Sequence, residues 1–98
     1  MISIRQTETF RSWLARLRDV RAQARINMRI RRLSLGNAGD AKPVGAGVWE
    51  MRIDYGPGYR VYYVQTGQSI VLLLLGGDKS TQEKDIKAAV EIAKSLEG

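Results

Sequence analysis

The sequence predicts a single α+β domain, residues 1–98, in which an antiparallel sheet carries a helical hairpin on one face and is followed by a C-terminal helix. A length of 98 residues suits one compact domain. Apolar residues recur with a helical period before residue 36 and after residue 80. Between residues 48 and 75 they alternate or run continuously, which is typical of strands. The predicted order is therefore β-α-α-β-β-β-α, with the helices mainly on one face of the sheet.

A short strand and two helices are predicted for the first third of the chain. Residues 2–5 alternate between apolar and polar, and Thr7 then suits the N-cap of a helix. The apolar positions of that helix, spaced by three and four residues, are Phe10, Trp13, Leu14 and Leu17. Asp19 is the predicted N-cap of a second helix, which ends at Gly36. So short a junction between two helices predicts an αα-hairpin.

A three-stranded meander and a final helix are predicted for the rest of the chain. The glycine-rich segment 36–47 is expected to form a loop. The predicted strands, separated by glycine-containing turns, are 48–55, 59–66 and 70–75. Ser80 and Glu83 have the spacing of a capping box, which predicts that the last helix begins at Ser80. The predicted buried stripe of this helix consists of Ile86, Ala89, Val90, Ala93 and Leu96.

The composition excludes several classes of site. There is no cysteine and no histidine, so disulfides, thiolate or imidazole metal sites and Ser-His-Asp catalysis are excluded. We therefore expect no metal and no cofactor. Any chemistry must use arginine, lysine, tyrosine, carboxylates or backbone groups.

The charge balance indicates a polyanionic partner. Sixteen basic and ten acidic residues give a net charge of +6, which favours nucleic acid or an acidic protein. The N-terminus has no secretory pattern, and the longest strongly apolar run, 70–75, is far shorter than the roughly 20 residues of a membrane span. We therefore expect a soluble, cytoplasmic protein with no membrane partner.

A cluster of polar residues is predicted on two neighbouring strands. If Met51 and Val61 face the helices, then Glu50, Arg52, Arg60 and Tyr62 project from the opposite, exposed face. Paired arginines suit a phosphate, because the guanidinium donates two parallel hydrogen bonds. The alternative interpretation is a set of ordinary solvated charges, in which Glu50 neutralises one arginine.

A second candidate site is the segment 76–79, which follows the last strand. Its two glycines allow close approach of a ligand to the backbone, and Lys79 lies where it can meet a phosphate held by the arginines. The alternative is a plain strand-to-helix turn in which Asp78 lies near the helix N-terminus. The spacing is not that of a P-loop.

A third feature is an arginine-rich helix face. Spacings of three and four residues place five arginines on one stripe of the predicted second helix and its approach: Arg18, Arg21, Arg25, Arg29 and Arg32. Such a stripe suits an RNA or DNA backbone or an acidic partner segment. The alternative is a solvated helix face.

Two sequence stretches carry a resemblance to a known family. The stretches 47–63, GVWEMRIDYGPGYRVYY, and 72–86, LLLLGGDKSTQEKDI, resemble toxins of the RelE/ParE superfamily, most closely the HigB-like addiction-module killer proteins of type II toxin–antitoxin systems. The resemblance covers essentially the whole chain. It implies a RelE-like α+β fold and a cognate antitoxin with a helix-turn-helix domain, through which alone DNA would be contacted.

The RelE and HigB members of this family imply an activity. They are mRNA interferases, that is, metal-independent endoribonucleases that bind RNA at the ribosome and inhibit translation. The 2′-hydroxyl attacks the adjacent phosphate and leaves a 2′,3′-cyclic phosphate and a 5′-hydroxyl. The resemblance implies that Arg60 holds the scissile phosphate and that Lys79 and, by a looser match, Arg52 assist. Glu50 or Tyr62 is a candidate proton acceptor, and Asp78 is a further candidate.

The family also leaves an alternative open. Its ParE branch shares the fold but inhibits DNA gyrase without cleaving RNA. A third possibility is a basic nucleic-acid-binding module without toxicity. The chain departs from some relatives in lacking histidine and a C-terminal tyrosine near Asp85. If Arg60 is exposed, Arg60→Ala is expected to abolish growth arrest without unfolding the protein.

Overall fold

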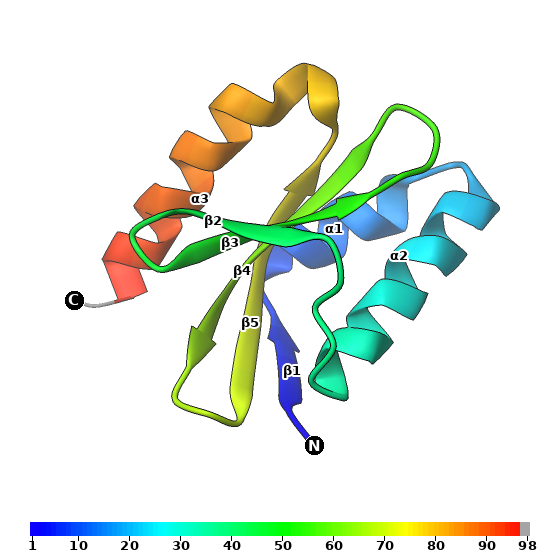
Figure 1. Cartoon of the computed structure of the whole chain (residues 1–98). Helices are drawn as coiled ribbons and strands as arrows, with labels where there is room; N and C mark the ends of the chain where they lie inside the picture. Colours follow the sequence, from blue (N-terminus) through cyan, green and yellow to red (C-terminus); the bar gives the residue numbers. More distant parts are fainter. Residues whose placement is uncertain (97–98) are drawn as a thin grey trace.

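A five-stranded sheet forms the centre of the computed structural model, which describes residues 1–96 (Figure 1). The strand order is β1-β5-β4-β3-β2. The strands are β1 (Ser3–Gln6), β2 (Ala41–Gly45), β3 (Val48–Ile53), β4 (Tyr59–Thr66) and β5 (Ile70–Gly77). The antiparallel meander of β3, β4 and β5 is confirmed. The sheet is not antiparallel throughout, because β1 pairs with β5 in parallel.

The strand β2 was not expected, since residues 36–47 were predicted to form a loop. It pairs antiparallel with β3 at the edge of the sheet. Pro43 is tolerated there because an edge strand has one side on which no N–H is needed. The glycine and proline residues of this segment are typical of a loop, so the sequence gives no local signal for the strand. The segment is extended because it pairs with β3.

The helices are α1 (Glu8–Arg16), α2 (Val20–Ser34) and α3 (Gln82–Leu96), with a short 3₁₀ turn, η1 (Lys79–Thr81), before α3. The predicted N-caps of the hairpin are confirmed. The Phe10 N–H donates to Thr7 Oγ1 at 3.0 Å, and Asp19 accepts from two N–H groups of α2. The capping box near the last helix is wrong by two residues, because Asp78 and Thr81 form it and Ser80 lies inside η1.

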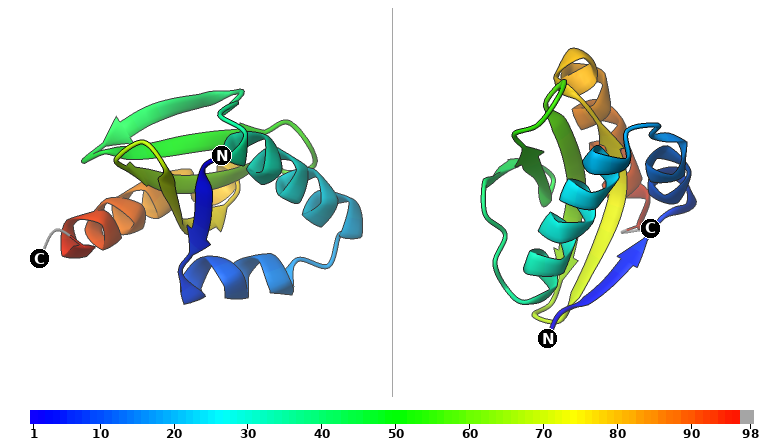
Figure 2. Two further views of the ribbon diagram at one scale, coloured as in Figure 1. Left: turned by 90° about the horizontal axis from the view of Figure 1, so that it is seen from below. Right: turned by 90° about the vertical axis from the view of Figure 1, so that its right-hand side faces the viewer.

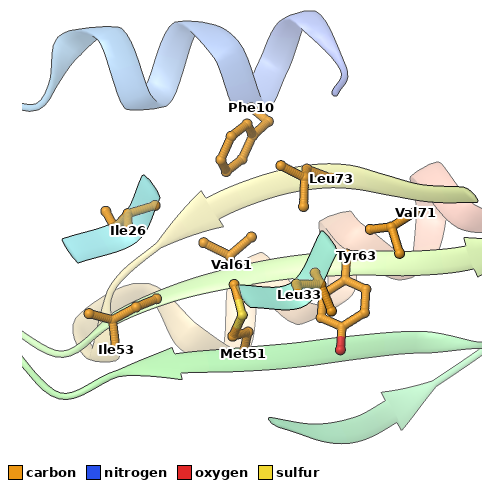
Figure 3. Close-up of a cluster of buried hydrophobic side chains, with 9 residues drawn as sticks. All are labelled: Phe10, Ile26, Leu33, Met51, Ile53, Val61, Tyr63, Val71 and Leu73. Atoms are coloured by element: carbon orange, nitrogen blue, oxygen red, sulfur yellow. The ribbon is translucent and has the colours of Figure 1, made fainter. Parts of the chain in front are cut away.

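The helices lie on both faces of the sheet, which corrects the expectation that they lie mainly on one. On one face α1 and α2 cover a core, shown in Figure 3, in which Phe10, Ile26 and Leu33 meet β3, β4 and β5. On the other face α3 contributes Ala89 and Ala93 to a second core. Two further views show the hairpin and α3 separated by the sheet (Figure 2). The predicted stripe of α3 ends early, since Leu96 is exposed.

This three-layer arrangement buries the sheet face that was expected to be exposed. Glu50 and Tyr62 have no exposed surface, and Arg60 is 8% exposed. The strand alternation itself is as predicted, because Met51 and Val61 face the helical hairpin. The error lies in the position of α3, which no local pattern specifies. None of the helices among residues 1–96 is long and apolar enough to cross a membrane.

Candidate active site

Three of the predicted site residues surround one surface pocket. Arg52, Arg60 and Lys79 line a hollow of about 300 Å³ at the end of the sheet where the β3–β4 turn meets η1. Arg52 and Arg60 are direct partners across the β3–β4 pair. The Lys79 N–H donates to the Pro57 carbonyl at 3.4 Å, which attaches η1 to that turn. Three cations therefore converge on a space large enough for a phosphate group.

Glu50 lies beneath this pocket and neutralises the arginines. Its Oε1 accepts from Arg52 Nε at 3.3 Å, and its Oε2 lies 3.7 Å from Arg60 Nε. Like charges directly opposite each other on a sheet are destabilising, so this shared carboxylate is what permits the Arg52–Arg60 pair. The alternative interpretation, that Glu50 neutralises an arginine, is thus correct for both. The charges are not ordinary solvated ones, however, since Glu50 is buried.

Two further donors complete the environment of Glu50. Its Oε2 accepts from Tyr62 Oη at 3.1 Å and from Gln82 Nε2, in the first turn of α3, at 2.9 Å. Burial and the neighbouring Glu50 carboxylate raise the pKa of Tyr62 well above its usual range. Tyr62 therefore remains a protonated donor at neutral pH. Because Glu50 and Tyr62 are buried and bonded to each other, the geometry favours a positioning role for both over proton exchange with a substrate.

The Arg60 guanidinium is held in place from two sides. Its Nη1 donates to the Gly58 carbonyl at 2.8 Å, and its Nε faces Glu50 without a hydrogen-bond partner among residues 1–96. Gly58 has a φ of +80°, and a Cβ there would lie 3.2 Å from Arg60 Nη1. Glycine at position 58 therefore allows both the turn and the close approach of Arg60.

The segment 76–79 matches its alternative interpretation as a structural turn. A Cβ at Gly76 would lie 2.2 Å from the Trp13 ring, and one at Gly77 would lie 1.8 Å from Asp85 Oδ2. Both glycines therefore make room for side chains of this chain. Asp78 accepts from the Ser80 N–H at 2.8 Å and from the Ser80 hydroxyl at 2.5 Å. Asp78 thus shapes the turn that carries the exposed Lys79.

The arginine-rich face of α2 is only partly free. Arg29 is half-buried, and its guanidinium donates to the carbonyls of Arg52 at 2.5 Å and Ala38 at 3.1 Å. The guanidinium of Arg25 lies 4.6 Å above the centre of the Tyr55 ring. The remaining side chains of the stripe are exposed, namely Arg18, Arg21 and Arg32. Arg29 therefore connects α2 to the sheet through its hydrogen bonds, and its guanidinium is not free to bind a partner.

Sequence reasoning missed three polar residues of the site. Gln82 was treated only as part of a helix start, and its contact with Glu50 depends on the docking of α3. Asp40 and Asp54 line the same pocket as the cations. Asp54 directly follows β3, beside the glycine-containing turn, and this position in the sequence was a signal that its carboxylate lies near the arginines. Within residues 1–96, no group of three or more carboxylates is arranged to hold a metal ion.

Comparison with known proteins assigns this chain to a family. Residues 12–96 match the model of the family described as "Phage derived protein Gp49-like (DUF891)". The chain belongs to the Gp49-like family. This is a family of toxins of toxin–antitoxin modules, of the RelE/HigB type, so the predicted toxin–antitoxin relationship is confirmed at this level. Membership of a toxin–antitoxin family implies an antitoxin partner for the Gp49-like chain.

A relative of known sequence is similar over almost the full length. The Gp49-like chain is 55% identical over 95 residues to an uncharacterised protein of Haemophilus influenzae, covering 97% of this chain and 96% of that protein. The two proteins therefore match in length as well as in sequence.

Proposed function

We propose that this Gp49-like chain is a cytoplasmic toxin that cleaves mRNA on the ribosome and is neutralised by a helix-turn-helix antitoxin. The observation that carries the proposal is the convergence of Arg52, Arg60 and Lys79 on one pocket, with the two arginines anchored on buried Glu50. A rigid array of cations stabilises the extra negative charge of a pentacoordinate phosphate without reorganising during the reaction.

In the proposed reaction, the RNA supplies its own nucleophile. The 2′-oxygen bonds to the adjacent phosphorus as its proton leaves, and the bond from phosphorus to the 5′-oxygen breaks. The products are a 2′,3′-cyclic phosphate and a 5′-hydroxyl. Arg60 and Arg52 hold the phosphate oxygens, and Lys79 protonates the departing 5′-oxygen. The pocket carboxylates Asp40 and Asp54 are exposed and available to accept the 2′-hydroxyl proton.

The remaining predicted site residues position the three cationic side chains. Glu50 and Tyr62 orient the arginines from below, and Asp78 holds the turn that presents Lys79. No metal or cofactor enters this mechanism, because the cationic side chains supply the charge stabilisation.

Lys79→Ala is the sharpest test of this proposal. The substitution earlier expected to leave the fold intact, Arg60→Ala, is unsuitable because Arg60 is buried and its loss leaves Glu50 undercompensated. Lys79 is exposed and its side chain makes no ion pair among residues 1–96. Lys94→Ala, an equal loss of charge at the far end of α3, is the matched control.

The experiment is primer extension on mRNA from a translation reaction, with and without ribosomes. We expect new 5′ ends with the wild type and Lys94→Ala only when ribosomes are present, and a loss of at least about 100-fold with Lys79→Ala. A parallel supercoiling assay with purified DNA gyrase tests the ParE-like alternative. Inhibited supercoiling with no new mRNA ends contradicts the nuclease proposal.

A further inference from the structure

The exposed face of α2 forms a second basic surface, which adjoins the pocket at the end of the sheet through Ile53 and Asp54. Its side chains follow one stripe, with spacings of four, three and four residues, and they are Arg21, Arg25, Met28 and Arg32. We call these four residues the α2 stripe. Beside it lies a hollow of about 300 Å³ whose lining includes Arg25, Met28, Arg32 and Asp54.

The arginines of the α2 stripe make no ion pair with another side chain among residues 1–96. No acidic residue occurs between Asp19 and Asp40. The ion pairs found among residues 1–96 involve Arg11, Arg52 and Arg60, none of them on α2. Arginines four residues apart on a helix repel one another. An external negative partner would remove this repulsion.

The chemistry of the stripe favours a peptide over a nucleic acid. Met28 is 53% exposed at the centre of the arginines, and buried Ile53 forms part of the floor of the hollow. A phosphodiester backbone has no apolar group to cover such a side chain, whereas an amphipathic helix does. Arg25 covers one face of the aromatic ring beside the stripe, Tyr55, so that face is not open to a base.

A peptide can also fit the carboxylate at the edge of the hollow. Asp54, which this hollow shares with the pocket at the end of the sheet, can remain in solvent while a peptide directs its own acidic groups to the arginines. We propose that the α2 stripe receives an acidic, amphipathic helix of the antitoxin, with an aliphatic side chain on Met28 and carboxylates on Arg21, Arg25 and Arg32. The inference rests on the proposed function in one respect only, namely that the docking helix belongs to the antitoxin.

The first test measures peptide binding by fluorescence anisotropy. The probe is a synthetic amphipathic helix of about four turns, with leucines on one face and glutamates on the other. Met28→Ser and the pair Arg25→Gln/Arg32→Gln are each expected to weaken binding at least about tenfold. The matched control, Lys87→Gln/Lys94→Gln, removes the same charge from α3 and is expected to bind as the wild type does.

An oligouridine of similar length separates peptide from RNA. Loss of positive charge weakens binding of either probe, but loss of Met28 weakens binding of the peptide alone. Unchanged peptide affinity in Met28→Ser, or equal affinity for a version of the peptide with glutamines in place of glutamates, overturns the proposal. Thermal unfolding of each variant verifies that the fold is retained.

The second test identifies the source of the helix. Each variant is added to a translation reaction with and without the cognate antitoxin. Variants of the α2 stripe are expected to arrest translation fully and to escape neutralisation. Loss of arrest in these variants shows that the stripe contacts the ribosome and overturns the proposal. Failure of the wild type to arrest translation contradicts the proposed nuclease function instead, and the peptide measurement is unaffected by it.

Discussion

The Nε atom of Arg60 lies 3.7 Å from the Oε2 atom of Glu50, and both side chains are buried between the sheet and α3. The same carboxylate accepts a hydrogen bond from the half-exposed Arg52. One buried anion therefore determines where two guanidiniums lie at the edge of the pocket. The site and the stability of the protein depend on the same contact.

Replacing Glu50 with glutamine is expected to destabilise the protein. Glu50→Gln leaves the Arg52 and Arg60 charges without their buried partner, and we expect the free energy of unfolding to fall by about 3 kcal/mol. Urea denaturation followed by circular dichroism measures this. The control is Glu91→Gln, an exposed position of α3, where we expect a change within about 0.5 kcal/mol. Equal stability of the two variants contradicts the anchoring role of Glu50.

Substitutions at Arg52 separate charge from geometry. Arg52→Ala is expected to reduce RNA cleavage about 100-fold, because a positioned cation is lost from the pocket. Arg52→Lys is expected to recover only part of this loss, since an ammonium cannot donate two parallel hydrogen bonds to a phosphate. Single-turnover cleavage on programmed ribosomes gives the rates. Full activity of Arg52→Lys would show that charge alone is required there.

The Asp19 N-cap of α2 should make the stability of the protein fall at acid pH. Asp19 Oδ2 accepts from Tyr55 Oη at 2.9 Å, and this bond, with those from the Ala22 and Arg21 N–H groups, lowers the pKa of Asp19. A lowered carboxyl pKa contributes stability above the unfolded value near pH 4, and this contribution is lost as the pH falls through the folded value. The stability advantage of the wild type over Asp19→Asn should therefore shrink below about pH 4.

Urea denaturation between neutral and acid pH measures this difference. Glu91→Gln serves again as the control, because its exposed carboxyl is remote from the Asp19 cap. A wild-type advantage over Asp19→Asn that stays constant down to the lowest pH contradicts the assigned cause.

Close packing of Gly76 against Trp13 predicts a coupled pair of mutations. Gly76→Ala places a Cβ 2.2 Å from the indole ring, so the ring or β5 must move, and we expect a loss of about 2 kcal/mol. Trp13→Leu removes the obstructing ring. In a double-mutant cycle, Gly76→Ala should cost much less in the Trp13→Leu background. If the losses in free energy of unfolding of the two single variants simply add in the double variant, the close contact between Gly76 and Trp13 is contradicted.

The pocket shows where local patterns were sufficient. Alternation along β3 and β4 places Arg52 beside Arg60, and the short distance in sequence from β5 to η1 brings Lys79 to the same end of the sheet. These relationships are local or involve neighbouring strands, so residue spacing predicts them. Sequence reasoning could not predict that Gln82 reaches Glu50, because that contact requires α3 to cross the sheet.

Residue order by itself determined the helical hairpin with its Thr7 and Asp19 caps, the β3–β4–β5 meander and the set of cations at its end. These features follow from side-chain period and from turns, which act over a few residues. The tertiary structure alone decided that α3 covers the face opposite the hairpin, that β1 pairs in parallel with β5, and that Glu50 is buried. Which face a helix covers depends on apolar surface contributed by distant segments, and no period within the helix encodes it.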